Sequence, residues 1–113
     1  MDKTEASRIA RTESLFRDVN ERIAESTSRF GAEDASFVCE CSDPTCTERV
    51  HAQLDDYDEV RDDGAKFLLA KGHEDDGVEK VVERNVGYNV VRKYPPVLRQ
   101  LVEAMNPRRA TAQ

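Results

Sequence analysis

The spacing of apolar residues along the first third of the chain predicts a long helix. Over residues 4–30 the apolar positions recur at intervals of three, four or seven, so they share one face of a helix. These positions are Ile9, Phe16, Val19, Ile23 and Phe30. Asp2 or Thr4 could cap the start of this helix, and Gly31 follows it as a C-terminal stop.

After this helix the period of the pattern changes to two. Residues 37–41 alternate as in a strand, with Phe37, Cys39 and Cys41 on one side and Glu40 on the other. Residues 42–45 form a turn by composition, and residues 46–52 read as the returning strand of a hairpin. By this alternation the side chain of Glu40 points away from the cysteines, and we expect it at the surface.

The second half of the chain continues with short elements. We expect a helix over residues 54–61, a strand over 67–71 and a hairpin from 79–84 to 88–93. Two prolines end this hairpin, and a short final helix follows them. The apolar residues of that helix are Val97, Leu98, Leu101, Val102 and Met105. Together the segments predict an α+β fold, in which the long N-terminal helix packs on a small, mostly antiparallel sheet of four or five strands.

Length and composition limit the size of the core. The 113 residues, of which 38% are hydrophobic, correspond to a single domain, which we place at residues 1–105 with a disordered tail at 106–113. The longest apolar run covers residues 67–70, far below the roughly 18–20 residues that span a bilayer. The first residues also lack the apolar core of a signal peptide, so we expect a cytoplasmic protein that does not enter a membrane.

Three cysteines fall within eight residues of one another, at Cys39, Cys41 and Cys46. An odd number of thiols this close together disfavours a disulfide framework and favours a metal site. In a strand the first two side chains share a face, and the turn at Pro44 folds the third back beside them. Zinc suits this set, because it takes soft sulfur ligands in a tetrahedral shell.

A structural zinc site needs a fourth ligand, and the chain has only two histidines. His73 lies in a Gly-His-Glu loop after a predicted strand, which frees its ring to turn inward. His51 shares its side of the hairpin strand with Arg49, which indicates a solvent face. The pattern therefore favours a Cys3His site with His73, which would tie the first hairpin to the later loop. If neither histidine reaches, a water completes an open site.

Other uses of the cysteines have weaker support. Buried thiols can pack as small apolar groups, and a redox or catalytic thiol needs a neighbouring base, which no recognisable motif supplies here. The signatures of zinc deaminases and of zinc proteases are both absent from the sequence. We therefore expect a protein that is not an enzyme.

The cysteine segment also belongs to a longer pattern. From Cys39 it reads C-E-C-x-D-P-x-C-x-E-R, and a Gly-His-Glu follows at residues 72–74. With weaker similarity from about residue 13 to about residue 93, the chain resembles a family of short bacterial proteins of actinobacterial type and unknown function. The resemblance implies that the three cysteines and His73 belong together. His51 and the chain from Tyr94 onward lie outside the pattern.

Two further surfaces are candidates for binding a partner. On the first helix four arginines lie within roughly 60° of one another beside the apolar face. They could form a ridge that binds phosphate or acidic groups. Alternatively, their aliphatic side-chain stems flank a stripe that faces the core. The four arginines are Arg8, Arg11, Arg22 and Arg29. The final helix could pack within the domain or dock into a partner's groove. Its candidate residues are Leu98, Leu101, Val102 and Met105.

These observations favour a small zinc-binding, non-enzymatic module for protein interaction or regulation, with another protein as its partner. A nucleic-acid-associated regulator is one alternative, although the formal net charge of -6 counts against phosphate binding. A thiol/zinc redox sensor and a hydrolase with an open zinc site are the others.

Overall fold

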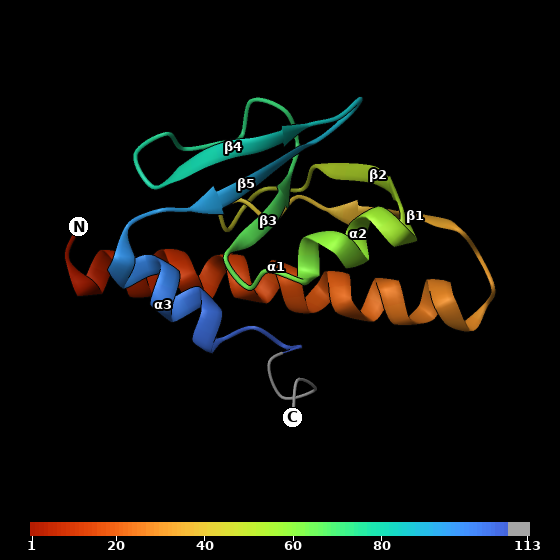
Figure 1. Cartoon of the computed structure of the whole chain (residues 1–113), viewed down its shortest axis with the longest axis horizontal. Coiled ribbons are helices and arrows are strands. Elements are labelled where there is room, and N and C mark those ends of the chain that lie inside the picture. The colour runs from red at the N-terminus through yellow and green to blue at the C-terminus, as the bar shows by residue number, and fades with distance from the viewer. Residues whose placement is uncertain (109–113) are drawn as a thin grey trace.

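The computed structural model describes residues 1–108, and within that range the chain forms three helices and two antiparallel sheets. In chain order the elements are α1 (Lys3–Arg29), β1 (Asp34–Val38), β2 (Arg49–Gln53), α2 (Leu54–Arg61), β3 (Lys66–Leu69), β4 (Glu79–Arg84), β5 (Asn89–Lys93) and α3 (Pro96–Ala104). Both sheets lie along one side of α1, and α3 packs against its N-terminal half (Figure 1). This arrangement confirms the predicted α+β class.

The ends of α1 follow from its flanking residues, as the sequence predicts. Asp2 caps the first turn, because its Oδ1 accepts a hydrogen bond from the N–H of Glu5 at 2.8 Å. Beyond the last turn Gly31 adopts a φ of 70°, in the left-handed region that glycine enters without strain. With 27 residues, at ~1.5 Å per residue, the helix is roughly 40 Å long and supports both sheets.

The strands divide between two sheets instead of forming one. β1 pairs with β2, and β5 lies between β3 and β4 in the second sheet. Just after β1, the N–H of Cys39 still donates to the carbonyl of Glu48 on the β2 side, at 3.0 Å. The next N–H, that of Glu40, donates to the carbonyl of Leu68 in β3 at 2.8 Å. The chain therefore crosses from one sheet to the other within the cysteine segment, and this crossing divides the predicted single sheet.

Two apolar clusters fill the space between α1, the sheets and the shorter helices. The first joins α1 to α3 and the three-stranded sheet, and it includes Ile9, Phe67, Val91, Leu98 and Val102. The second lies around α2 and β1, and it includes Phe37, Val50, Tyr57, Val60 and Val90. In the second cluster the rings of Phe37 and Tyr57 stack with their centroids 4.4 Å apart. Because Leu68 and Val90 belong to the three-stranded sheet, the second cluster packs against both sheets.

Part of the apolar face of α3 is buried against α1. Leu98 and Val102 are 0% exposed, and Leu101 packs against the same cluster. Met105 lies just after the helix, where its sulfur accepts a hydrogen bond from the hydroxyl of Ser14 at 3.4 Å. Leu98 and Val102, two of the candidate partner-binding residues, are therefore buried within the domain. Their burial against α1 removes apolar area from water within the domain itself.

The buried face of α1 is not the apolar stripe that the sequence predicts. Of the five apolar positions in that stripe only Ile9 is buried, whereas Val19 and Phe30 are 37% and 81% exposed. The helix instead turns small and polar side chains inward. The buried residues besides Ile9 are Ala6, Ala10, Glu13, Ser14, Arg17, Asn20, Ala24 and Thr27. The predicted stripe is thus rotated largely to the surface.

This polar face of α1 meets buried charges from the sheets. Lys93 of β5 lies 2.7 Å from the carboxylate of Glu13 and also pairs with Glu79 of β4. Arg17 donates to two backbone carbonyls and places its guanidinium 4.7 Å from the centre of the Phe67 ring. The buried charged residues are Glu13, Glu40, Glu79, Arg17, Arg61 and Lys93. Three acids therefore balance three bases, which explains why a polar helix face can be buried.

Glu40 occupies the second half of this ionic network. Its carboxylate accepts hydrogen bonds from Asn20 at 2.7 Å and from the N–H of Leu68 at 2.9 Å, and it pairs with Arg61 at 3.0 Å. The side chain points away from the neighbouring cysteines, as alternation predicts. However, that side of the chain is covered by α1, and Glu40 is 0% exposed. The expected surface position of Glu40 is therefore wrong.

The last described residues lie against α1 and α2. Arg108 forms ion pairs with Glu21 and with Asp58, each at 2.8 Å. The tail predicted at residues 106–113 thus begins with residues that the structure places, and residues 109–113 lie outside the described range.

From residue 1 to residue 108, no helix has both the length and the apolar character needed to cross a membrane.

Candidate metal centre

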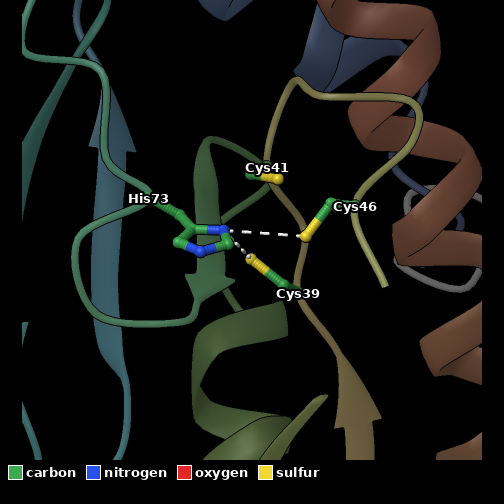
Figure 2. A group of neighbouring side chains, drawn as sticks. All are labelled: Cys39, Cys41, Cys46 and His73. Carbon is green, nitrogen blue, oxygen red and sulfur yellow. Dashed lines mark hydrogen bonds between the residues drawn. The ribbon is translucent and has the colours of Figure 1, made fainter. Parts of the chain in front are cut away.

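The three cysteines and His73 come together from two loops. Cys39 and Cys41 follow directly on β1, Cys46 lies in the turn that leads to β2, and His73 lies between β3 and β4. Figure 2 shows the four side chains converging, with the His73 ring turned toward the sulfurs. The four ligand atoms all lie within 4.8 Å of one another. The fold thus brings the cysteines next to a histidine that lies 27 or more positions further along the sequence.

The distances within this cluster match a tetrahedral metal shell. Nδ1 of His73 lies 3.6 Å from Sγ of Cys39 and 3.6 Å from Sγ of Cys46. A tetrahedral ion with bonds of ~2.3 Å to sulfur and ~2.0 Å to nitrogen holds those atoms about 3.5 Å apart. The four residues could therefore hold a metal ion with little movement of the loops.

A tight turn returns Cys46 to the first two cysteines. The N–H of Cys46 donates to the carbonyl of Asp43 at 3.1 Å. Oδ1 of Asp43 accepts hydrogen bonds from the backbone N–H and the hydroxyl of Thr45, at 2.9 and 2.7 Å. These bonds lower the pKa of the exposed Asp43 carboxyl. With Pro44 inside the turn, the segment is held by its own short-range hydrogen bonds.

The loop that carries His73 is shaped by its neighbours. Gly72 adopts a φ of 88°, a left-handed conformation that bends the chain just before the histidine. The N–H of His73 donates to the carbonyl of Ala70 at 3.1 Å, and Oε2 of Glu74 accepts from the N–H of Gly72 at 3.2 Å. The Gly-His-Glu sequence therefore supplies the bend, the candidate ligand and the acceptor that closes the loop.

Burial and nearby backbone donors act in opposite directions on the protonation of the sulfurs. Burial raises the pKa of the Cys39 thiol and that of the Cys41 thiol. Backbone hydrogen bonds oppose this effect, and the N–H of Ala70 approaches Sγ of Cys39 at 3.2 Å. Three thiols packed this closely lose their protons only when a positive charge compensates the thiolates. The cluster is therefore a set of ligands that a metal ion would complete.

One side of the cluster borders the core and the other side approaches solvent. Cys39 and Cys41 are buried in the apolar cluster around α3, whereas Cys46 and His73 are half-buried. Beside the histidine lies a shallow hollow of about 280 Å³. It is lined by Cys41, Ser42, Asp43, Gly72 and His73. All three cysteines of the chain are described, and none forms a disulfide.

The other candidate residues lie away from this cluster. His51 is exposed on β2, where its Nε2 is 3.4 Å from Oδ2 of Asp34. The structure therefore brings His73, and not His51, to the thiols. The four arginines singled out on α1, Arg8, Arg11, Arg22 and Arg29, are all exposed.

The backbone group that supports Cys39 could not be predicted from the sequence. The N–H of Ala70 gives no signal in a sequence, because a backbone donor matters only through the atom that lies next to it. The buried charges did leave a signal. Glu13, Arg17 and Asn20 recur at spacings of four and three, which is the helical periodicity that the apolar stripe also follows.

Within residues 1–108 these four residues form the one cluster of His, Cys, Asp and Glu side chains arranged to hold a metal ion. The interpretation of the site therefore rests on its own geometry and chemistry. Comparisons of the chain with protein-family models, with curated proteins and with solved structures find no match.

Proposed function

We propose that this protein is a small zinc-binding, non-enzymatic module that acts in protein interaction or regulation. The observation that carries the proposal is the convergence of Cys39, Cys41, Cys46 and His73, whose ligand atoms lie within 4.8 Å of one another. Three thiolates and an imidazole in a tetrahedral arrangement suit zinc better than harder cations. We also propose that the C-E-C-x-D-P-x-C-x-E-R and Gly-His-Glu pattern marks this site, and that a family of short bacterial proteins of unknown function shares it.

A structural role for the zinc is supported by the origin of its ligands. The cluster ties the loop after β1 to the loop after β3, and two of its cysteines border the apolar core. A chain of 113 residues with 38% hydrophobic content has a small core, so a metal tie adds stability that packing does not supply. Four protein ligands also fill a tetrahedral shell, which leaves no position for a substrate and supports a non-enzymatic role.

Native mass spectrometry before and after treatment with a chelator tests this proposal. We expect a single zinc ion per chain, and its removal should be accompanied by loss of the compact charge-state distribution. His73→Ala should lose most of the metal, whereas the matched variant His51→Ala should keep it. Equal losses in the two variants would overturn the role of His73. Absence of metal, or its removal without unfolding, would overturn the structural role.

A thiol/zinc redox sensor is a second candidate, and the solvent access of the cluster favours it. Cys46 is half-buried, and the hollow beside His73 reaches the cluster from outside. Peroxide would oxidise two thiols to a disulfide and would itself be reduced to water. Loss of these two sulfur ligands would release the zinc. This candidate predicts loss of folded structure on addition of peroxide and its return with reductant and zinc. A zinc site that resists peroxide would exclude it.

A further inference from the structure

The rotation of α1 leaves an apolar stripe on its surface, which we call the α1 face. It consists of Leu15, Phe16, Val19, Ile23 and Phe30. Leu15 is 64% exposed, Val19 is 37% exposed and Phe30 is 81% exposed, whereas Phe16 and Ile23 are half-buried. Apolar side chains at spacings of three and four are the pattern by which a helix meets another element. On α1, Leu15, Val19 and Phe30 carry this pattern to the surface, so the α1 face is suited to a partner outside the domain. Ile23 also packs against the second apolar cluster.

The α1 face has a shape that a second helix could fit. A hollow of about 360 Å³ lies on it, lined by Val19, Arg22, Ile23, Ser26 and Thr27. The small side chains of Ser26 and Thr27 separate Ile23 from Phe30, which leaves room for a large side chain from outside. This is the arrangement of a hole that receives a knob in helix pairing. The C-terminal half of α1 also extends beyond α3 (Figure 1).

Positive charge lines one edge of the α1 face. At ~100° per residue, Arg8, Arg11 and Arg22 lie within roughly 60° of one another and next to Leu15 and Val19. All three arginines are exposed. Within the described part of the chain none of them forms an ion pair. In a chain with a net charge of -6, this edge is a local concentration of cations without acidic partners.

We propose that the α1 face is the docking site for an acidic amphipathic helix of a partner protein. This inference rests on the proposed interaction role and specifies the chemistry of the partner. Apolar side chains of the partner pack on Val19, Ile23 and Phe30, and aspartates or glutamates along its edge pair with Arg8, Arg11 and Arg22. Complementary charge of this kind speeds association and sets the orientation of the two helices.

Other occupants fit the α1 face less well. If two copies of the chain paired through antiparallel α1 helices, the two-fold axis would place the arginine edge of one copy beside that of the other. Such a pair would be opposed by like charges. Residues 109–113 of the same chain read Arg-Ala-Thr-Ala-Gln, which offers neither an acid nor a large apolar side chain. A nucleic acid would leave Leu15, Val19 and Phe30 without an apolar contact.

Selection from a display library of random 18-residue peptides against the full zinc-loaded chain tests the proposal. We expect enriched peptides with apolar residues at spacings of three and four, flanked by aspartate and glutamate. Their affinity should fall about tenfold or more for the double variant Arg11→Glu/Arg22→Glu and for Val19→Ser. Arg84→Glu, which changes an exposed arginine on β4, is the matched control and should bind normally.

The remaining outcomes overturn the docking proposal. They are the absence of enriched peptides, enrichment of basic peptides, binding that ignores the α1 variants, tighter binding of a single-stranded oligonucleotide, and concentration-dependent dimers that Val19→Ser abolishes. Metal content is measured on the same samples, because loss of zinc contradicts the proposed function and not the docking site. Zinc-loaded protein that selects no acidic peptide contradicts the docking site alone.

Discussion

The candidate metal centre and the buried ionic network lie on opposite sides of the segment formed by residues 39–41. The side chains of Cys39 and Cys41 turn to the metal cluster, and Glu40 between them turns to the ionic network beneath α1. The ionic network contains its own counter-charges, since three acids and three bases are buried together. The Cys3His cluster contains three thiols and a histidine, and a metal ion could bind among them. One short segment thus joins a self-sufficient ionic network to a cluster that we propose to be a ligand-dependent centre.

The two centres should contribute to the stability of the fold in different ways. A ligand-dependent centre contributes only while its ion is bound, so its contribution varies with the free metal concentration. A buried ion pair contributes little beyond the cost of its own desolvation, but removing one partner leaves the other charge uncompensated. The two centres should therefore respond differently to chelators, to single substitutions and to pH.

The largest effect is expected from removal of the metal cluster. Cys41→Ser should lose most of its folded structure, because three remaining ligands hold zinc weakly and metal binding is coupled to folding. Circular dichroism and thermal unfolding measure the loss, and wild-type protein with a chelator should reproduce it. If Cys41→Ser loses its metal and stays folded, the ionic network and the core suffice without the zinc.

Breaking the ionic network should cost less and spare the metal. Glu40→Gln keeps the shape of the side chain but leaves Arg61 without its counter-charge, which should lower the free energy of unfolding by about 3–5 kcal/mol. Urea unfolding of the zinc-saturated protein measures the change. Glu48→Gln, at an exposed acid near the same cysteines, is the control and should change stability by less than about 0.5 kcal/mol. A similar cost in both variants would mean that the pair with Arg61 is unimportant.

Glu13 should make stability depend on pH in the opposite sense to a surface carboxylate. Burial raises its pKa from 4.5 to about 7, against the opposing attraction of Lys93. Between those two values the folded state binds the proton more tightly than the unfolded state does. The free energy of unfolding should therefore fall as pH rises from about 4.5 to 7, by an amount on the order of 3 kcal/mol.

Glu13→Gln tests this dependence, since an amide does not titrate. The difference in unfolding free energy between wild type and variant should change across that window and level off above it. Comparison of the two zinc-saturated proteins at each pH cancels the protonation of the metal ligands, which both proteins share. A difference that is constant with pH would contradict the raised pKa of Glu13.

The smallest effect is expected at the surface of α1. Arg29 pairs with Glu25 at 2.9 Å, and both side chains are mostly exposed. Arg29→Ala should lower the free energy of unfolding by roughly 0.3–0.5 kcal/mol, and salt should weaken the effect. Thermal unfolding at low and high ionic strength measures it. A cost comparable with that of Glu40→Gln would show that burial is not what separates the two ion pairs.

Most boundaries of the elements could be predicted from the sequence, because they depend on neighbouring residues. The main exception is β1, which covers Asp34–Val38 and not the predicted residues 37–41, so the cysteines follow the strand and do not lie within it. Asp2 caps α1 through a bond to a residue three positions away, and the hairpin of β4 and β5 forms where the alternation predicts it. The orientation of α1 could not be predicted in the same way. Its apolar stripe indicated the wrong face, since the burial of Glu13 and Arg17 depends on Lys93 and Val102, which are 80 and 85 positions away.

The sequence by itself determined the α+β class and the three cysteines as candidate metal ligands, because both follow from short-range patterns and from the few residue types that bind zinc. Only the tertiary structure decided that His73 and not His51 completes the cluster, that Glu40 is buried, and that the apolar stripe of α1 faces solvent. The reason is physical: a local pattern specifies where a side chain points relative to its own element. Whether protein, metal or water lies in that direction depends on segments far away in the chain.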